Sequence, residues 1–464
     1  MSRKTGAGRP ASAPPVPAPA SSRPVVTRRQ AMTLAATATA VPWVHVRTAN
    51  AAGRLSIGFW DHWVPGANAT TEALVREWAD REKVEVSVDF ITSQGNKLLL
   101  TTAAESQARS GHDVLAMGTW LPSEYARNLE PMNDLMEPLI KANGRVNATV
   151  EYLGKIDGKW VAVPATSGSQ IKGPCSRIDL LKQHAGIDIQ AMYPAGGPPK
   201  ADAWNLDSFM KAAAACNKAG VPFGIGLGTT ADNVDTLGAF FHAHGAMLVD
   251  AKGNITVKTD PVRKVMTYYR ELQEHLPRDV ASWDDASNNK WLVSGRGAMI
   301  MNPPSAWAVA VRDAPAVAEQ LWTHGFPSGP NGRYAPFNPL FWSVWSFSKN
   351  KSAGKSLIAH LSQKPAVERM VKASFGFDLS AFADLATLPV YGEQGPPKGT
   401  LYHYPNPHEH QTLSIAAAPA PHKIAVQIYT QGIMTKMAVR HFQGEALEKT
   451  LDWASRELEG FMRS

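Results

Sequence analysis

The sequence predicts an α/β protein with two domains, and two observations carry this prediction. Between residues 55 and 117, three apolar stretches typical of strands are separated by two stretches with helical periodicity. Strands and helices in alternation indicate a parallel sheet with helices on its faces. The second observation is length, because residues 52–464 are too many for one ordinary hydrophobic core.

The elements of this first part follow from the periodicity. Strands are expected at 55–60, 83–90 and 113–117, and helices at 70–82 and 96–109. The second strand alternates strictly between apolar and polar residues, so one of its faces is expected to be exposed. Trp78 lies on the apolar face of the first helix and is expected in the core.

Further along the chain the same rhythm continues with interruptions. A strand is expected at 159–163 after a turn at Asp157-Gly158, and helices are expected at 207–217, from Asp260-Pro261 onward, and at 445–462. Gly220 is suited to end the helix before it. Gly224, Gly226 and Gly228 lack the spacing of a dinucleotide-binding loop, and we interpret them as a glycine-rich strand.

Residues 1–51 have the features of an export signal. The paired Arg28-Arg29 precedes an apolar segment of about 14 residues, which is shorter than the roughly 20 residues of a membrane-spanning helix. Ala49-Asn50-Ala51 then offers a small-x-small cleavage site. The arginine pair resembles a twin-arginine signal. We expect a mature chain that begins near Ala52 and lies in the periplasm; the alternative is a basic tail ahead of a helix.

Charge also separates this segment from the rest of the chain. Residues 1–51 hold seven Lys or Arg and no Asp or Glu, whereas the whole chain has 47 basic and 40 acidic residues. Residues 52–464 are therefore balanced. A nucleic-acid-binding protein would keep its positive charge in the folded part, so no nucleic-acid partner is expected. Cys175 and Cys216 could pair after export or remain two buried free thiols.

A family resemblance rests on short motifs that follow one another in a fixed order. The motifs lie at His112–Val114, Asn128–Met132, Asp157–Pro164, Pro198–Phe209, His244–Asp250, Ser294–Met299, Phe347–Asn350 and Gly444–Leu447. In this order they resemble the bacterial extracellular solute-binding proteins of the maltose-binding type, over nearly the whole mature chain. Two positions depart from the family pattern: no Thr precedes Trp204, and Ala246 stands where Gly is common.

The resemblance implies a two-lobe periplasmic binding protein fold with a central ligand cleft, several crossings of the chain between lobes and a closing hinge. We expect one lobe to comprise residues 52–163 and 338–392, and the other 164–337 and 393–464 with C-terminal helices. It also implies a partner, the permease subunits of an ABC-type membrane importer. The protein is expected to act as a monomer.

The candidate ligand-binding residues lie just after expected strands, because ligands of open α/β sheets bind beyond the carboxyl ends of the strands. They are Trp60, Asp61, His62, Trp63, Thr119, Trp120, Ser167, Asn302, Trp307, Asn338 and Trp342. We expect residues 60–63 and Trp120 on one wall of the cleft, and Asn302 and Trp307 on the other. Of Trp342 and Trp345, one is expected in the core.

This mixture of indole rings with Asp, His, Asn, Ser and Thr fits a sugar. The C–H face of a sugar ring packs on an aromatic plane, and its hydroxyl groups need donors and acceptors. We therefore expect capture of a sugar or oligosaccharide for transport. The alternative is another solute in the same fold, such as a polyol or a small amphipathic compound.

Other classes of function have weaker support in the sequence. The chain has no His-Glu-x-x-His, Gly-x-Ser-x-Gly or Walker A motif, so we expect no enzymatic activity and no cofactor. His403, His408 and His410 could hold zinc, but their proline-rich surroundings favour a solvated loop. Tyr268-Tyr269 is a pair typical of iron-binding proteins, but here Tyr269 is expected to face a helix core.

Overall fold

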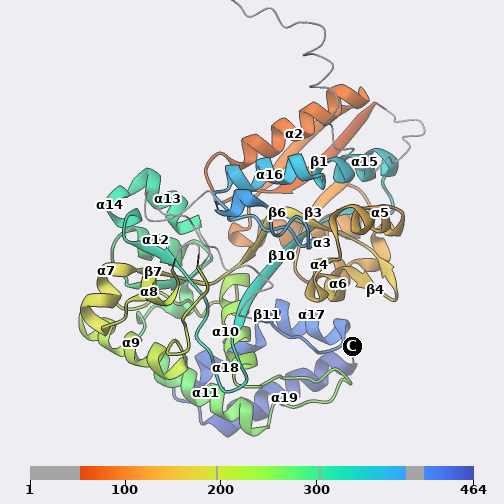
Figure 1. Cartoon of the computed structure of the whole chain (residues 1–464). Helices are drawn as coiled ribbons and strands as arrows, with labels where there is room; N and C mark the ends of the chain where they lie inside the picture. Colours follow the sequence, from red (N-terminus) through yellow and green to blue (C-terminus); the bar gives the residue numbers. More distant parts are fainter. Residues whose placement is uncertain (1–52, 195–196, 303–304, 393–411, 464) are drawn as a thin grey trace, which may run out of the picture. The chain divides into compact units, whose positions relative to one another are not determined.

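The computed structural model describes residues 53–194, 197–302, 305–392 and 412–463 (Figure 1). The chain divides into two units, residues 1–43 and 44–464, and every described residue belongs to the second. The expected export signal at 1–51 and the histidines at 403, 408 and 410 lie outside the described residues. None of the helices in the described part is long and apolar enough to cross a membrane.

Six strands form the first sheet, in the order β11-β10-β3-β1-β2, with β6 also paired to β10. The strands are β1 (Arg54–Trp60), β2 (Glu85–Ile91), β3 (Val114–Gly118), β6 (Val163–Ile171), β10 (Tyr334–Val344) and β11 (Thr412–Ser414). β1 pairs in parallel with β2 and β3, which confirms the parallel sheet expected at the start of the chain. β10 runs antiparallel to β3 and β6.

Helices cover this sheet, and α2 packs beside α15 and α16 (Figure 1). The helices of this part are α2 (Ala67–Glu82), α3 (Lys97–Ala108), α4 (Leu121–Glu124), α5 (Asn133–Asn143), α6 (Ala148–Gly154), α15 (Lys351–Leu361) and α16 (Lys364–Ala373). Trp78 on α2 is 0% exposed and its indole N–H donates to Ser356 Oγ, so its place in the core is confirmed.

The second sheet has three antiparallel strands in the order β8-β7-β9. They are β7 (Pro174–Arg177), β8 (Met299–Met301) and β9 (Leu321–Thr323). The helices that accompany them are α7 (Ile178–Leu180), α8 (Ile189–Met192), α9 (Leu206–Lys218), α10 (Ala231–Ala243), α11 (Asp260–Gln273), α12 (Ser287–Val293), α13 (Ser305–Asp313), α14 (Pro315–Ala318), α17 (His422–Thr430), α18 (Ile433–Phe442) and α19 (Leu447–Arg463). A capping box at Asn205 begins α9, since the Asn205 side chain accepts from the N–H groups of Asp207 and Ser208.

Two strands lead from one sheet toward the other. β6 belongs to the first sheet and ends at Ile171, and β7 of the second sheet begins at Pro174. β9 in turn precedes β10, which returns to the first sheet and packs against α10. The polypeptide therefore passes between the two sheets in both directions, and the lobe limits predicted above remain a prediction.

Two sequence-based expectations about strands were wrong. The strand expected at 159–163 is divided, because Lys159–Trp160 pairs with Lys155–Ile156 in a separate hairpin, β4-β5, before β6 begins. The glycine-rich strand at 224–228 forms no strand, only an isolated bridge from Gly224 to Ile300. A Cβ at Gly226 would lie 2.3 Å from Asn233 Oδ1, so this glycine permits close packing against α10.

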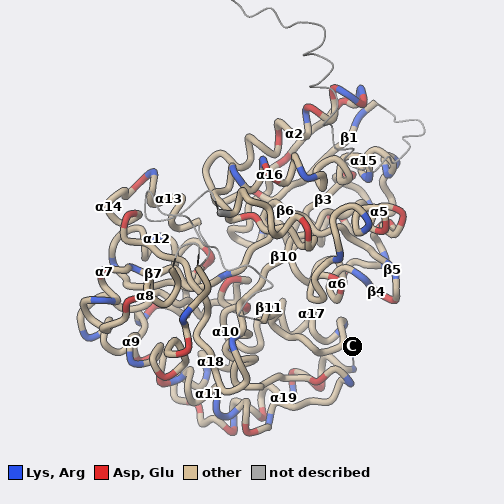
Figure 2. Tube along the Cα trace, viewed as in Figure 1, with Lys and Arg blue, Asp and Glu red and all other residues tan. Residues whose placement is uncertain are grey.

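Charged residues of both signs are interspersed on the helices, as expected from the balanced charge of residues 52–464 (Figure 2). Cys175 and Cys216 are both buried and free. Of the two states that the sequence allowed, a disulfide or two buried free thiols, the structure therefore has the free thiols.

Candidate ligand-binding site

A cavity of about 200 Å³ gathers side chains from around both sheets. From the first sheet and the turns that follow its strands come Trp60, Trp63, Thr119, Trp120, Gln170 and Asn338. Asp232 comes from α10, Asp285 from the segment that precedes α12, and Tyr429 from α17. Residues far apart in the sequence therefore meet at one place.

The strands of the first sheet explain why the aromatic residues meet there. β1 ends at Trp60 and β3 ends at Gly118, and these two strands run parallel, so their carboxyl ends lie at the same edge of the sheet. Thr119 and Trp120 follow β3 directly, and Trp63 follows β1 after a short turn. The sequence pattern placed candidate binding residues at these carboxyl ends, and their contact with a ligand stays a prediction.

The indole rings differ in how firmly the protein holds them. Trp120 is 1% exposed, its N–H donates to the Ala416 carbonyl over 3.2 Å, and Tyr152 meets it edge to face. Trp60 is also buried and stacks on Phe377 with ring centres 6.1 Å apart. Trp63 is half-buried and is the least enclosed of the three. Its ring is the one most available to a ligand.

The structure brings five of the eleven sequence-predicted residues to this cavity. They are Trp60, Trp63, Thr119, Trp120 and Asn338. Thr119 Oγ1 donates to Asn338 Oδ1 over 2.7 Å, so the turn after β3 and strand β10 are joined at the cavity wall. The remaining six do not line it.

Asp61, His62 and Ser167 lie close to the cavity in sequence but do not line it. Asp61 Oδ1 accepts from Asn68 Nδ2 at the start of α2. His62 is buried between two partners: its Nδ1 accepts from the Val64 N–H, and its Nε2 donates to Asp378 Oδ1 over 2.8 Å. His62 therefore joins structural elements. Ser167 is half-buried on β6.

Asn302, Trp307 and Trp342 also lie away from this cavity. Asn302 is buried and its amide donates to Asn288 and Asn289 on α12. Trp307 on α13 packs edge to face against Phe375. Trp342 packs against Phe59 in the core of the first sheet, and Trp345 is buried as well, so both rings of that pair are core residues rather than one.

Sequence reasoning missed a buried charge network behind the cavity. Lys172, just past β6, is 0% exposed, and its Nζ lies 2.7 Å from Asp232 Oδ1 and 2.9 Å from Asp235 Oδ2. Tyr429 donates to Asp235 over 3.3 Å. Asp285 accepts from the Asp232 N–H. Asp232 and Asp285 line the cavity, while Lys172 and Asp235 lie behind them.

Burial controls the charge of this network. Burial raises the pKa of Asp235 to about 6 although Lys172 opposes the shift. Burial and the neighbouring Asp232 raise the pKa of Asp285 to about 7. Burial alone would lower the pKa of Lys172, but the two carboxylates outweigh it and the pKa of Lys172 stands above its usual range. One signal was visible in the sequence: Asp232 and Asp235 stand three residues apart, on one face of a helix that holds no other charged carboxylate or ammonium group.

Residues 73–392 match the family described as bacterial extracellular solute-binding protein. The chain belongs to this family. The sequence resemblance is thereby confirmed, and with it the expectation of a solute-binding protein in place of an enzyme. No curated protein matches the chain in sequence.

Solved structures show that this solute-binding protein has the α/β fold of two-lobe periplasmic binding proteins. Maltose-bound MalE3 of T. maritima has a TM-score of 0.70 at 15% identity, covering 88% of this chain and 99% of that one. A sugar transporter protein of Arthrobacter chlorophenolicus with bound laminaribiose has a TM-score of 0.67 at 15% sequence identity, covering 88% of this chain and 99% of that one. A solute-binding protein of Agrobacterium vitis with bound D-mannitol has a TM-score of 0.64 at 18% sequence identity, covering 88% of this chain and 98% of that one.

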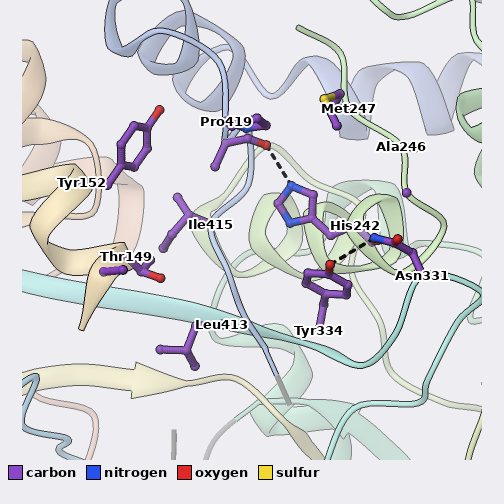
Figure 3. Close-up of a pocket in the computed structure, with 13 residues that line it drawn as sticks. Thr149, Tyr152, His242, Ala246, Met247, Asn331, Tyr334, Leu413, Ile415 and Pro419 are labelled. Atoms are coloured by element: carbon purple, nitrogen blue, oxygen red, sulfur yellow. Dashed lines mark hydrogen bonds between the residues drawn. The ribbon is translucent and has the colours of Figure 1, made fainter. Parts of the chain in front are cut away.

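A second, more open cavity of the solute-binding protein holds about 410 Å³ (Figure 3). Its lining is mostly apolar and includes Tyr152, Met247 and Ile415. Both ring nitrogens of His242 already have partners there: Nε2 lies 2.9 Å from the Ala418 carbonyl, and Nδ1 lies 2.8 Å from Ser414 Oγ. With these nitrogens satisfied internally, this cavity is the weaker candidate for a hydroxylated ligand.

The metal hypotheses gain no structural basis within the described part of the chain. It contains no group of three His, Cys, Asp or Glu side chains placed to hold a metal ion. The Tyr268-Tyr269 pair lies on α11, where Tyr269 is buried as expected and Tyr268 donates to the Leu206 carbonyl. These two hydroxyl groups therefore do not converge on one site.

Proposed function

We propose that this solute-binding protein captures a sugar, an oligosaccharide or a polyol in the 200 Å³ cavity and delivers it to an ABC-type importer. The observation that carries the proposal is the composition of the cavity. Indole rings and polar side chains from around both sheets face the same space. The fold relatives were solved with maltose, laminaribiose and D-mannitol, and these compounds share a chain or ring of hydroxyl groups.

The chemistry of such a ligand matches the cavity. The apolar C–H face of a sugar ring would pack on Trp63 with Trp60 beside it. The hydroxyl groups would reach Asn338, Gln170 and the two aspartates at the opposite end of the lining. A solute held by residues from around both sheets favours the closed arrangement, since only contacts that differ between two states can shift their balance.

Transport follows from the family and from the N-terminal segment. We propose that residues 1–51 direct export by the twin-arginine route, that cleavage occurs near Ala52, and that the mature protein works as a monomer in the periplasm. The permease of an ABC-type importer would take over the solute there. The lobes of residues 52–163 with 338–392, and 164–337 with 393–464, would move about the crossing strands.

A thermal-shift panel of neutral sugars, polyols and small amphipathic compounds tests this function on the purified mature protein. A ligand at 100 times its Kd stabilises the folded state by about 2.7 kcal/mol, which gives a clear rise in Tm. We expect the rise with a mono- or oligosaccharide or a polyol. A rise confined to amphipathic compounds without several hydroxyl groups would replace the proposal by the alternative solute class.

A further inference from the structure

Four hydrogen-bond donors around the cavity are used within the protein. The Trp120 indole donates to the Ala416 carbonyl and Thr119 donates to Asn338. Tyr429 donates to Asp235, and Thr430 donates to the Val426 carbonyl over 2.8 Å. These four groups lie at the cavity but donate their protons to other atoms of the protein, so a ligand does not receive a hydrogen bond from them.

A second observation is a buried acceptor without a partner. Gln170 lines the cavity from β6 and is 4% exposed. Its Oε1 has no hydrogen-bond partner among the described residues. A buried carbonyl oxygen left without a donor is destabilising, so a ligand that donates to it recovers that loss.

The charges around the cavity are also unbalanced. Asp232, Asp235 and Asp285 face a single cation, Lys172. Lys172 forms ion pairs with the first two, and its charge also acts on Asp285, but the described residues contain no ion pair of Asp285, which accepts from the Asp232 N–H. The residues that line the cavity include no Lys, Arg or His. A positive charge delivered by a ligand is therefore what would compensate the third carboxylate.

We infer that the preferred solute is a hydroxylated compound with a protonated amine, such as an amino sugar or amino polyol, whose ammonium group binds between Asp285, Asp232 and Gln170. The inference rests on the proposed function and narrows it. An ammonium group has three donors and no acceptor, which suits a lining that offers unpaired acceptors. The neutral part of the solute would keep the indole contacts.

A divalent metal ion fits the same place poorly. Calcium takes six to eight oxygen ligands, and magnesium needs a near-ideal octahedron. Here Lys172 already holds one oxygen of Asp232 and one of Asp235. The described residues contain no cluster of three metal-ligating side chains.

The inference predicts a characteristic dependence on pH. The groups that face Asp285 are Asp232 on α10, Lys172 after β6 and Tyr429 on α17, and burial with Asp232 raises the pKa of Asp285 to about 7. Below that pH the empty site holds a proton on Asp285, which an ammonium group must displace. Affinity for an amine therefore rises from pH 5 to pH 7, whereas that for a neutral sugar does not.

The experiment compares matched pairs by isothermal titration of the mature protein at pH 5 and pH 7. The pairs are D-glucose with D-glucosamine, D-galactose with D-galactosamine, and D-glucitol with D-glucamine. We expect at least one amine to bind about tenfold more tightly than its parent at pH 7, as a charge-assisted hydrogen bond allows. This advantage should shrink at pH 5.

The Asp285→Asn variant separates charge from shape. It should remove the advantage of the amine, so that the amine and its neutral parent bind the variant with affinities within about twofold of each other. Asp157→Asn is the control, because Asp157 is exposed in the β4-β5 turn and Asn tolerates its left-handed backbone, φ 50°. The melting temperature of each variant reports whether its fold is intact.

Each outcome decides the inference. If neutral parents bind as tightly as every amine, or if the advantage survives in Asp285→Asn, the inference is wrong while the proposed function stands. If none of the six compounds binds, the inference is likewise overturned, and the wider panel of neutral sugars and polyols then decides the proposed function by itself.

Discussion

At the scale of single residues, the tryptophans divide by what their rings contact. Trp63 lines the cavity and is half-buried. Trp120 also lines it, but it is almost fully enclosed and hydrogen-bonded to the Ala416 carbonyl. Trp78 has no part in the cavity and lies in the core beside Ser356. Truncation of these three rings should therefore have three different consequences.

Trp63→Ala should weaken ligand binding by about tenfold to a hundredfold, because it removes an apolar plane worth roughly 1–3 kcal/mol. Its effect on the free energy of unfolding should be small. Trp78→Ala should lower that free energy by about 3–5 kcal/mol and leave the affinity of the folded fraction unchanged. Trp120→Ala should lower both the ligand affinity and the free energy of unfolding. Titration calorimetry and urea unfolding measure the two quantities; a Trp63→Ala protein with full affinity would remove Trp63 from the site.

The residue scale also shows how far the sequence could predict the site. The sequence could predict four lining residues because they follow strands with a clear apolar pattern: Trp60, Trp63, Thr119 and Trp120. One predicted residue away from the cavity, Trp342, lies on β10, which is buried on nearly every residue, so that alternation could not distinguish Trp342 in the core from Asn338 at the cavity. Lys172, the α10 pair Asp232 and Asp235, and Asp285 come from three separate parts of the chain, and only the tertiary fold brings them together.

At the scale of elements, the crossing strand β6 shapes the cavity through one glycine. Gly168 has φ +86°, and a Cβ there would lie 2.7 Å from the Trp60 ring and 2.8 Å from the Leu340 side chain. Its N–H donates to Asp378 Oδ1, which also accepts from His62. The pairing of β6 with β10 shifts register between Asn338 and Leu340, beside this glycine. β6 thus sets the position of Trp60.

Gly168→Ala should therefore lower both the stability and the affinity. Gly158→Ala is the matched control, because Gly158 has φ +77° and nothing within 4 Å of its added Cβ. The control should lower the free energy of unfolding by about 1–2 kcal/mol, the penalty of an alanine in the left-handed conformation. Gly168→Ala should cost at least about 1 kcal/mol more from overpacking. Urea unfolding and titration with the best ligand provide the readouts, and equal effects of the two substitutions would contradict the role given to Gly168.

The elements themselves were predicted with uneven success. The helices at 70–82 and 207–217 and the first three strands match because their apolar periodicity is local and strong. The β4-β5 hairpin was missed, although the Asp157-Gly158 turn with two positive φ angles is typical of one. The division between hairpin and β6 depends on the pairing of Lys155 with Trp160, which no local pattern reveals.

At the scale of the whole molecule, the central claim is that the cavity gathered from around both sheets is where this solute-binding protein holds its ligand. The cavity of Figure 3 is the competing place. Each can be filled from its rim by one substitution. Thr229 is exposed at the rim of the first, and Thr149 lies half-buried in the wall of the second.

The most direct test is isothermal titration of Thr229→Trp and Thr149→Trp with the ligand that the thermal-shift panel identifies. An indole ring in the first cavity should occupy the ligand's place, so Thr229→Trp should weaken binding by at least about a hundredfold, or roughly 2.7 kcal/mol. Thr149→Trp should bind as the unsubstituted protein does. Full affinity in Thr229→Trp together with loss of binding in Thr149→Trp would contradict the account and place the ligand in the second cavity.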